Sequence, residues 1–158
     1  MVGSISRTGA GGFAAWNRVG IVYHAREPGV RDAQEEHATV MSWRDGVPGE
    51  VALVLIIKRV FPPPPVPVQK LYTTLVRDAR ASVIVALVQE RGFAVSVVRN
   101  IFARALSMRG GIKFEIASSI GDVADAIAQP YGDGASGTQL FTVIRELRET
   151  VDNGDAAP

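Results

Sequence analysis

The chain has 158 residues, of which 47% are hydrophobic and 21% are charged, a composition typical of a single folded domain. Its 17 basic and 16 acidic residues give a net charge of +1, which provides no electrostatic basis for binding nucleic acid or an anionic membrane. The absence of cysteine excludes disulfides, thiolate nucleophiles and cysteine-ligated metal sites. The first residues lack the apolar core of a signal peptide, and the longest aliphatic run, VALVLII (51–57), is far too short to span a bilayer. We therefore expect a cytoplasmic protein without a membrane span.

The first third of the chain alternates between strand and helix patterns. Residues 1–12 are rich in glycine and serine, and we expect a flexible N-terminus followed by an α/β domain over 13–129. VGIVYHAR (19–26) predicts a strand, paired with a short one around 13–16. Residues 30–44 predict a helix, whose apolar face gathers Val30, Ala33, His37, Val40 and Met41. EVALVLIIK (50–58) is apolar throughout, as expected for a strand covered on both faces.

A run of prolines, RVFPPPPVPVQKLY (59–72), follows that strand directly. Proline cannot continue a strand, and Pro67 is suited to the first turn of the next helix, so we interpret the run as a rigid loop. A polyproline II ligand for another domain is the alternative. The helix after it carries one apolar stripe, made of Val68, Leu71, Tyr72, Leu75, Val76 and Ala79.

The second half repeats the alternation. We expect strands at 82–88 and 112–117 and helices at 93–108 and 120–128. A glycine-containing spacer (130–137) then leads to an amphipathic helix over 138–151 and a polar tail over 152–158. Two strands that are apolar throughout, alternating with helices, predict an α/β fold with a mixed sheet that carries helices, plus an appended C-terminal helix.

The order of these elements resembles the STAS superfamily, named for sulphate transporters and anti-sigma-factor antagonists. The resemblance covers Trp16 to Ala128 and rests on EVALVLIIK, SVIVALV, the long helix GFAVSVVRNIFARALSM and the ending GGIKFEIASSIGDVADAIA. It implies a single STAS-like domain with helices packed on a mixed sheet, and a role in protein–protein regulation.

One departure from that family lies at the proline run. Anti-sigma antagonists carry a phosphorylatable serine at the start of the helix after the central strand, whereas RVFPPPPVPVQ has no hydroxyl residue. Thr73 and Thr74 come later, inside the predicted helix. We therefore expect the phosphorylation switch of that subgroup to be absent.

The sequence offers little for catalysis or metal binding. His37 lies on the apolar face of its helix, where we expect a histidine at the core edge with one hydrogen bond, and His24 is expected on a strand surface. In DAQEEH (32–37), we interpret the carboxylates as solvated and Asp32 as favourable to the helix dipole. Neither GAGG (9–12) nor GDGASG (132–137) links a buried strand to a helix as a phosphate loop does. We predict no catalytic residue, no cofactor and no metal; an enzyme that uses dispersed residues around His37 is a third hypothesis.

The apolar helix surfaces carry the functional prediction. The helix at 93–108 is apolar over about half its circumference, more than the stripe a surface helix needs, and the C-terminal helix has a stripe of its own. The spacer lets that last helix dock on its own domain or on another chain. We predict a non-enzymatic interaction or regulatory module that forms a homo-oligomer, with a carrier of a small apolar or lipid-like ligand as the alternative. The predicted interface consists of Val95, Phe102, Leu106, Leu140, Phe141, Ile144 and Leu147.

Overall fold

A computed structural model describes residues 4–58, 64–88, 99–100, 103, 112–131 and 137–155. Its centre is a six-stranded sheet in which the strands follow one another in chain order. The strands are β1 (Ile5–Thr8), β2 (Gly11–Trp16), β3 (Val19–His24), β4 (Ala52–Ile57), β5 (Val83–Val88) and β6 (Lys113–Ala117). The helices are α1 (Val30–Asp45), α2 (Val66–Ala79), α4 (Ile120–Tyr131) and α5 (Gly137–Asp155).

The sheet combines an antiparallel half with a parallel half. β1, β2 and β3 form an antiparallel meander, and Asn17 takes a left-handed conformation (φ 52°) in the tight turn between β2 and β3. From β3 to β6 all neighbours are parallel, so each connection must cross over the sheet. α1 and α2 provide the first two crossovers.

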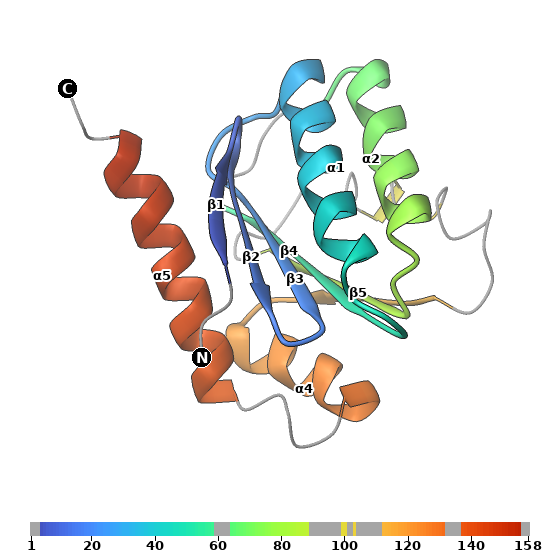
Figure 1. Cartoon of the computed structure of the whole chain (residues 1–158), viewed down its shortest axis with the longest axis vertical. Coiled ribbons are helices and arrows are strands. Elements are labelled where there is room, and N and C mark those ends of the chain that lie inside the picture. The colour runs from blue at the N-terminus through green and yellow to red at the C-terminus, as the bar shows by residue number, and fades with distance from the viewer. Residues whose placement is uncertain are drawn as a thin grey trace.

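The four helices with described bounds cover the two faces of the sheet in pairs. α1 and α2 lie side by side on one face, and α4 and α5 lie on the other (Figure 1). Each pair closes a separate apolar core, one under α1 and α2 and one under α4 and α5. The predicted α/β class, with a mixed sheet, packed helices and an appended C-terminal helix, is confirmed.

β4 and β5 show why an uninterrupted apolar run forms a strand here. Alternate residues of β4 enter opposite cores: Val54 and Ile56 pack toward α4 and α5, whereas Leu53 and Leu55 pack toward α1 and α2. A strand between two helical layers has no solvated face, so polar residues would be costly at every position. The prediction of a doubly covered strand at 50–58 is confirmed.

The C-terminal helix docks on its own chain. Its stripe is fully buried in the core with β2, and it consists of Leu140, Val143, Ile144, Leu147 and Val151. Gly12 on β2 allows this approach, because a Cβ there would lie 2.6 Å from Val151 Cγ2 and 2.9 Å from Leu147 Cδ1. The helix is also longer than predicted, since it begins at Gly137 and continues to Asp155, into the predicted tail.

The N-terminus differs from the sequence prediction. Residues 5–8, expected to be flexible, form β1, which pairs with β2 from Ile5↔Ala14 to Thr8↔Gly11. Short polar strands of this kind carry no apolar periodicity, so the sequence pattern misses them.

Two other predictions fall largely outside the described residues. They are the helix at 93–108, of which the structure describes residues 99, 100 and 103, and the proline run at 59–63. Pro67 does lie in the first turn of α2, as predicted.

Candidate functional site

A buried polar cluster lies where β3 ends. His24, the last residue of β3, meets Glu36 of α1 and Tyr72 of α2 beneath the two helices. His24 Nε2 lies 2.6 Å from Glu36 Oε2, and the Tyr72 hydroxyl lies 3.2 Å from each of these atoms. Glu36 is fully buried, and its other oxygen, Oε1, has no hydrogen-bond partner among the described residues.

The electrostatics of the cluster follow from its burial. Desolvation alone would lower the pKa of His24, but the adjacent Glu36 carboxylate and its hydrogen bond outweigh that effect and raise it above 6.5. Burial and the same carboxylate raise the pKa of the Tyr72 phenol, which therefore stays a hydrogen-bond donor. The cluster is thus a histidine–glutamate pair capped by a neutral tyrosine.

Two expectations about these residues are wrong. His24 was expected on a strand surface and Glu36 in solvent, yet both are buried. The spacing of the apolar residues does indicate that Glu36 is buried. Ala33, Glu36 and Val40 share one helix face, and they are the buried residues of α1. A glutamate between two apolar residues of a stripe needs a buried partner, and only the fold shows that His24 supplies it.

A charged network extends from this cluster to the turn between β1 and β2. Arg26 binds Asp32 through Nη1 at 3.0 Å and also donates to the Gly9 carbonyl. Asp32 accepts from the Gly29 amide at 2.9 Å and so caps the start of α1. Partial burial opposes ionisation of Asp32, but the hydrogen bonds from Gly29 and Arg26 prevail and lower its pKa. Asp32 therefore fixes the start of α1 against the first turn of the sheet.

A second network occupies the opposite face of the same strand end. The Tyr23 hydroxyl donates to Asp152 of α5 at 3.1 Å, and Lys58 forms an ion pair with the same carboxylate at 3.1 Å. The Arg148 guanidinium lies 5.7 Å from the centre of the Tyr23 ring. Consecutive residues of β3, Tyr23 and His24, therefore attach to opposite helical layers.

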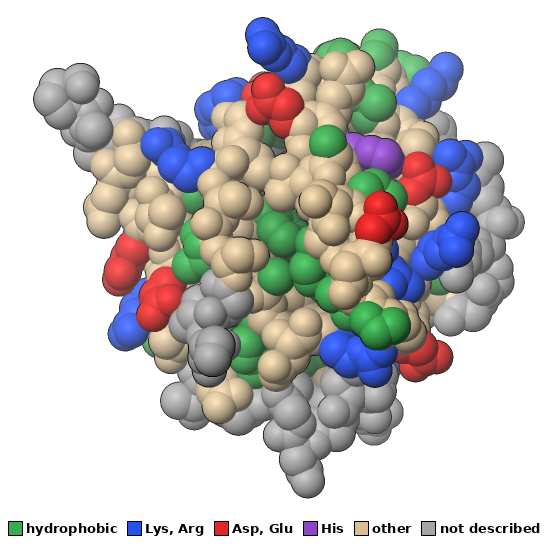
Figure 2. All heavy atoms as spheres, viewed as in Figure 1, with side chains coloured by type: hydrophobic (Ala, Val, Ile, Leu, Met, Phe, Trp, Pro, Cys, Tyr) green, Lys and Arg blue, Asp and Glu red, His purple; other side chains and the backbone are tan. Residues whose placement is uncertain are grey.

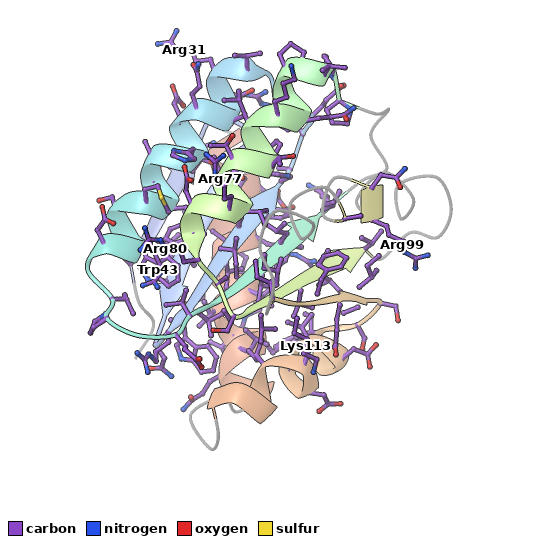
Figure 3. The ribbon with its side chains drawn as sticks, turned by 90° about the vertical axis from the view of Figure 1, so that its right-hand side faces the viewer. Arg31, Trp43, Arg77, Arg80, Arg99 and Lys113 are labelled. Atoms are coloured by element: carbon purple, nitrogen blue, oxygen red, sulfur yellow. The ribbon has the colours of Figure 1, made fainter. Side chains whose placement is uncertain are left out.

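The second histidine lies where the sequence predicted it. His37 Nε2 contacts Asp78 of α2 at 3.0 Å, at the half-buried edge of the α1–α2 contact. Arg77 lies 3.1 Å from the other oxygen of Asp78, on the α2 surface seen in Figure 3. Partial burial opposes ionisation of Asp78, but these two hydrogen bonds lower its pKa below the usual range. Within the described ranges, no group of three or more His, Cys, Asp or Glu side chains is placed to hold a metal ion.

The outer edge of the sheet presents a different kind of site. Among the described strands, β1 is hydrogen-bonded to β2 on one side and is the last strand of the sheet on the other. The Ala15 amide donates to the Ser4 carbonyl at 3.0 Å, and hydrogen-bonded pairs alternate along an antiparallel ladder. Ser6 therefore directs its main-chain groups toward β2, whereas Ile5 directs its amide and carbonyl away from it.

A groove of about 470 Å³ runs between this edge and α1. Its described lining consists of small hydroxyl or methyl side chains and two aromatic rings, and none of these residues is charged: Ser4, Ser6, Phe13, Ala38, Thr39, Ser42 and Trp43. The rings of Phe13 and Trp43 pack with their centres 5.7 Å apart. Figure 2 shows the front surface as mainly tan, the colour of the backbone and of uncharged polar side chains, with a green hydrophobic patch near its centre and charged side chains of both signs around it.

The predicted interface residues are distributed differently from this groove. Leu140, Ile144 and Leu147 belong to the core of the single chain, so their apolar surface is already covered. Phe141 remains 50% exposed beside a smaller hollow on α5. Val95, Phe102 and Leu106 lie outside the described residues.

Comparison with protein-family models, with curated proteins and with solved structures found no match. The STAS resemblance therefore stays a prediction based on the order of elements. In the described part of the chain, no helix is both long and apolar enough to cross a membrane.

Proposed function

We propose that this chain is a non-enzymatic protein-interaction module that accepts an additional β-strand at the open edge of β1. The supporting observation is that β1 is the outermost of the described strands and lies beside a groove whose described lining is uncharged. An extended peptide on such an edge gains main-chain hydrogen bonds, and its alternate side chains enter the groove between strand and helix. A regulatory role of this kind is also what the STAS resemblance implies.

The buried cluster favours interaction over catalysis as the use of this fold. His24, Glu36 and Tyr72 hydrogen-bond to one another beneath α1 and α2, with Glu36 Oε2 at the centre, and each residue is at least nine-tenths buried. Their geometry is suited to holding the helices on the sheet. The groove, in contrast, lies on the surface, with Ser4, Ser6 and Ser42 exposed.

Peptides selected from a random display library against the whole protein would test the proposal. Ile5→Pro removes an amide that points away from β2, so we expect it to abolish binding of the selected peptides while the β1–β2 ladder is kept. Ile5→Ala is the matched control, because it loses the same side chain but retains the amide. Fluorescence anisotropy measures both affinities, and circular dichroism verifies the fold. Equal affinity of the proline and alanine variants would refute strand addition at β1.

A further inference from the structure

The edge of β1 is complementary to itself. A strand added there must pair with outward main-chain groups at Ile5, and it must place uncharged small side chains against the groove. The segment Ser4–Thr8 of another copy has these properties, since Ser4, Ser6 and Thr8 face the α1 side and are small and uncharged. We infer that the added strand is β1 of a second copy, antiparallel about a two-fold axis at Ser6; this inference rests on the proposed function.

The choice of axis follows from the hydrogen-bond alternation. Residues that direct main-chain groups outward must pair with one another, so the axis can pass through residue 5, 6 or 7. An axis at Arg7 would place two guanidinium-bearing residues directly opposite one another, and an axis at Ile5 would shift the overlap toward the end of the strand. An axis at Ser6 centres the overlap on β1 and pairs Ile5 with position 7 of the second copy.

Charge supports a second copy over a charged partner strand. The one charged side chain of β1, Arg7, faces the opposite side from Ser6, where its guanidinium lies against Gly154 of α5. A partner strand with charged residues on the α1 side would have to bury them against Ser42, Ala38 and the aromatic rings of the groove. A second copy brings no charge to this side.

Two further features are compatible with the same register. Ser4 of the second copy comes opposite Thr8, which is also small and uncharged. The two-fold axis is perpendicular to the sheet, so both copies present α1 on the same face. The small side chains of Ala38 and Ser42 on α1 then allow the flanking helices to approach.

A charge-swap experiment at the axis tests the register. Ser6 is exposed and would lie directly opposite Ser6 of the second copy, at a Cβ separation of about 5 Å. Ser6→Lys and Ser6→Glu should each weaken the dimer roughly tenfold or more by like-charge repulsion, whereas an equal mixture of the two should restore it. Ser118→Lys and Ser118→Glu, exposed beyond β6 at the far edge of the sheet, are the matched controls.

Light scattering coupled to size exclusion gives the outcome for the full chain. We expect the wild type and both Ser118 variants at twice 16.9 kDa, each Ser6 variant shifted to the monomer, and a mixed dimer from the two. A dimer unaffected by either Ser6 variant would overturn the inference, as would monomeric variants that fail to combine. A monomeric wild type whose selected peptides still depend on the Ile5 amide would overturn the inference alone and leave the proposed function standing.

Discussion

Replacing Glu36 with glutamine should change both the stability of the fold and the sign of its pH dependence. Removing one charge of a buried pair costs about 3–5 kcal/mol when the remaining charge keeps no partner. Here His24 can lose its proton, and the glutamine amide can still accept from the Tyr72 hydroxyl, which contacts Glu36 at 3.2 Å. We therefore expect Glu36→Gln to lower the free energy of unfolding by about 2–3 kcal/mol at neutral pH.

The pH dependence gives a sharper test, because the contributions to the pKa of His24 oppose one another. In the wild type Glu36 prevails over desolvation, so the folded-state pKa lies above 6.5. The stability that this pair contributes is therefore complete below pH 6.5 and is lost as the pH rises through the folded-state pKa. In Glu36→Gln the carboxylate is gone but the desolvation of His24 remains, so we expect the pKa of His24 to fall below 6.5. Protonating the buried histidine then costs free energy, and the fold becomes less stable as the pH is lowered.

Urea unfolding across pH 5 to 9 measures how the free energy of unfolding changes with pH in the wild type and in Glu36→Gln. The titration of one proton can change that free energy by at most about 1.4 kcal/mol per pH unit. His24→Gln is the control for the wild type, and the double variant Glu36→Gln/His24→Gln is the control for Glu36→Gln, since each subtraction isolates what His24 contributes on that background. If Glu36→Gln and the wild type have parallel profiles after this subtraction, Glu36 does not determine the protonation of His24.

Four further substitutions, measured by chemical unfolding, probe the buried cluster and the docking of α5. Tyr72→Phe should cost about 1–2 kcal/mol, because it removes the hydroxyl that donates to Glu36; an unchanged midpoint would mean that this hydrogen bond contributes nothing. Gly12→Ala should cost about 1–3 kcal/mol, since its Cβ would fall 2.6 Å from a side-chain methyl of α5, and a neutral effect would show that α5 moves freely. Leu147→Ala should cost about 2–5 kcal/mol whereas Phe141→Ala stays within about 0.5 kcal/mol, and similar losses for the two would contradict docking of α5 by its buried stripe.

The elements that the sequence predicts well are those with strong apolar periodicity. β4 and β5 are recognisable as uninterrupted runs, and α2 and α5 as stripes, because burial in two cores requires those patterns. β1 has no such pattern: its stability comes from pairing with β2, and half of its side chains are exposed. Local sequence cannot reveal a strand whose formation depends on a partner that folds beside it.

The candidate sites are harder to predict because their partners are distant in the sequence. His24 and Glu36 are 12 residues apart, and Tyr72 follows 36 residues after Glu36. The α1 stripe could have indicated that Glu36 is buried, but the identity of its partner depends on how far β3 extends before α1 begins. The edge groove is equally invisible, since Ser6 and Trp43 come together only when β1 and α1 lie side by side.

The two polar networks and the open edge are connected through β3. Tyr23 is tied to α5 by Asp152, and His24 is tied to α1 by Glu36, so the end of β3 fixes both helices that flank β1. The Ala10 carbonyl also accepts from the Ala25 amide just after β3, which holds the turn between β1 and β2 at the same place. A groove between a strand and a helix keeps its width only if both walls are fixed. The buried pair therefore stabilises the shape that a strand added at β1 would require, and weakening it at high pH should loosen the groove along with the fold.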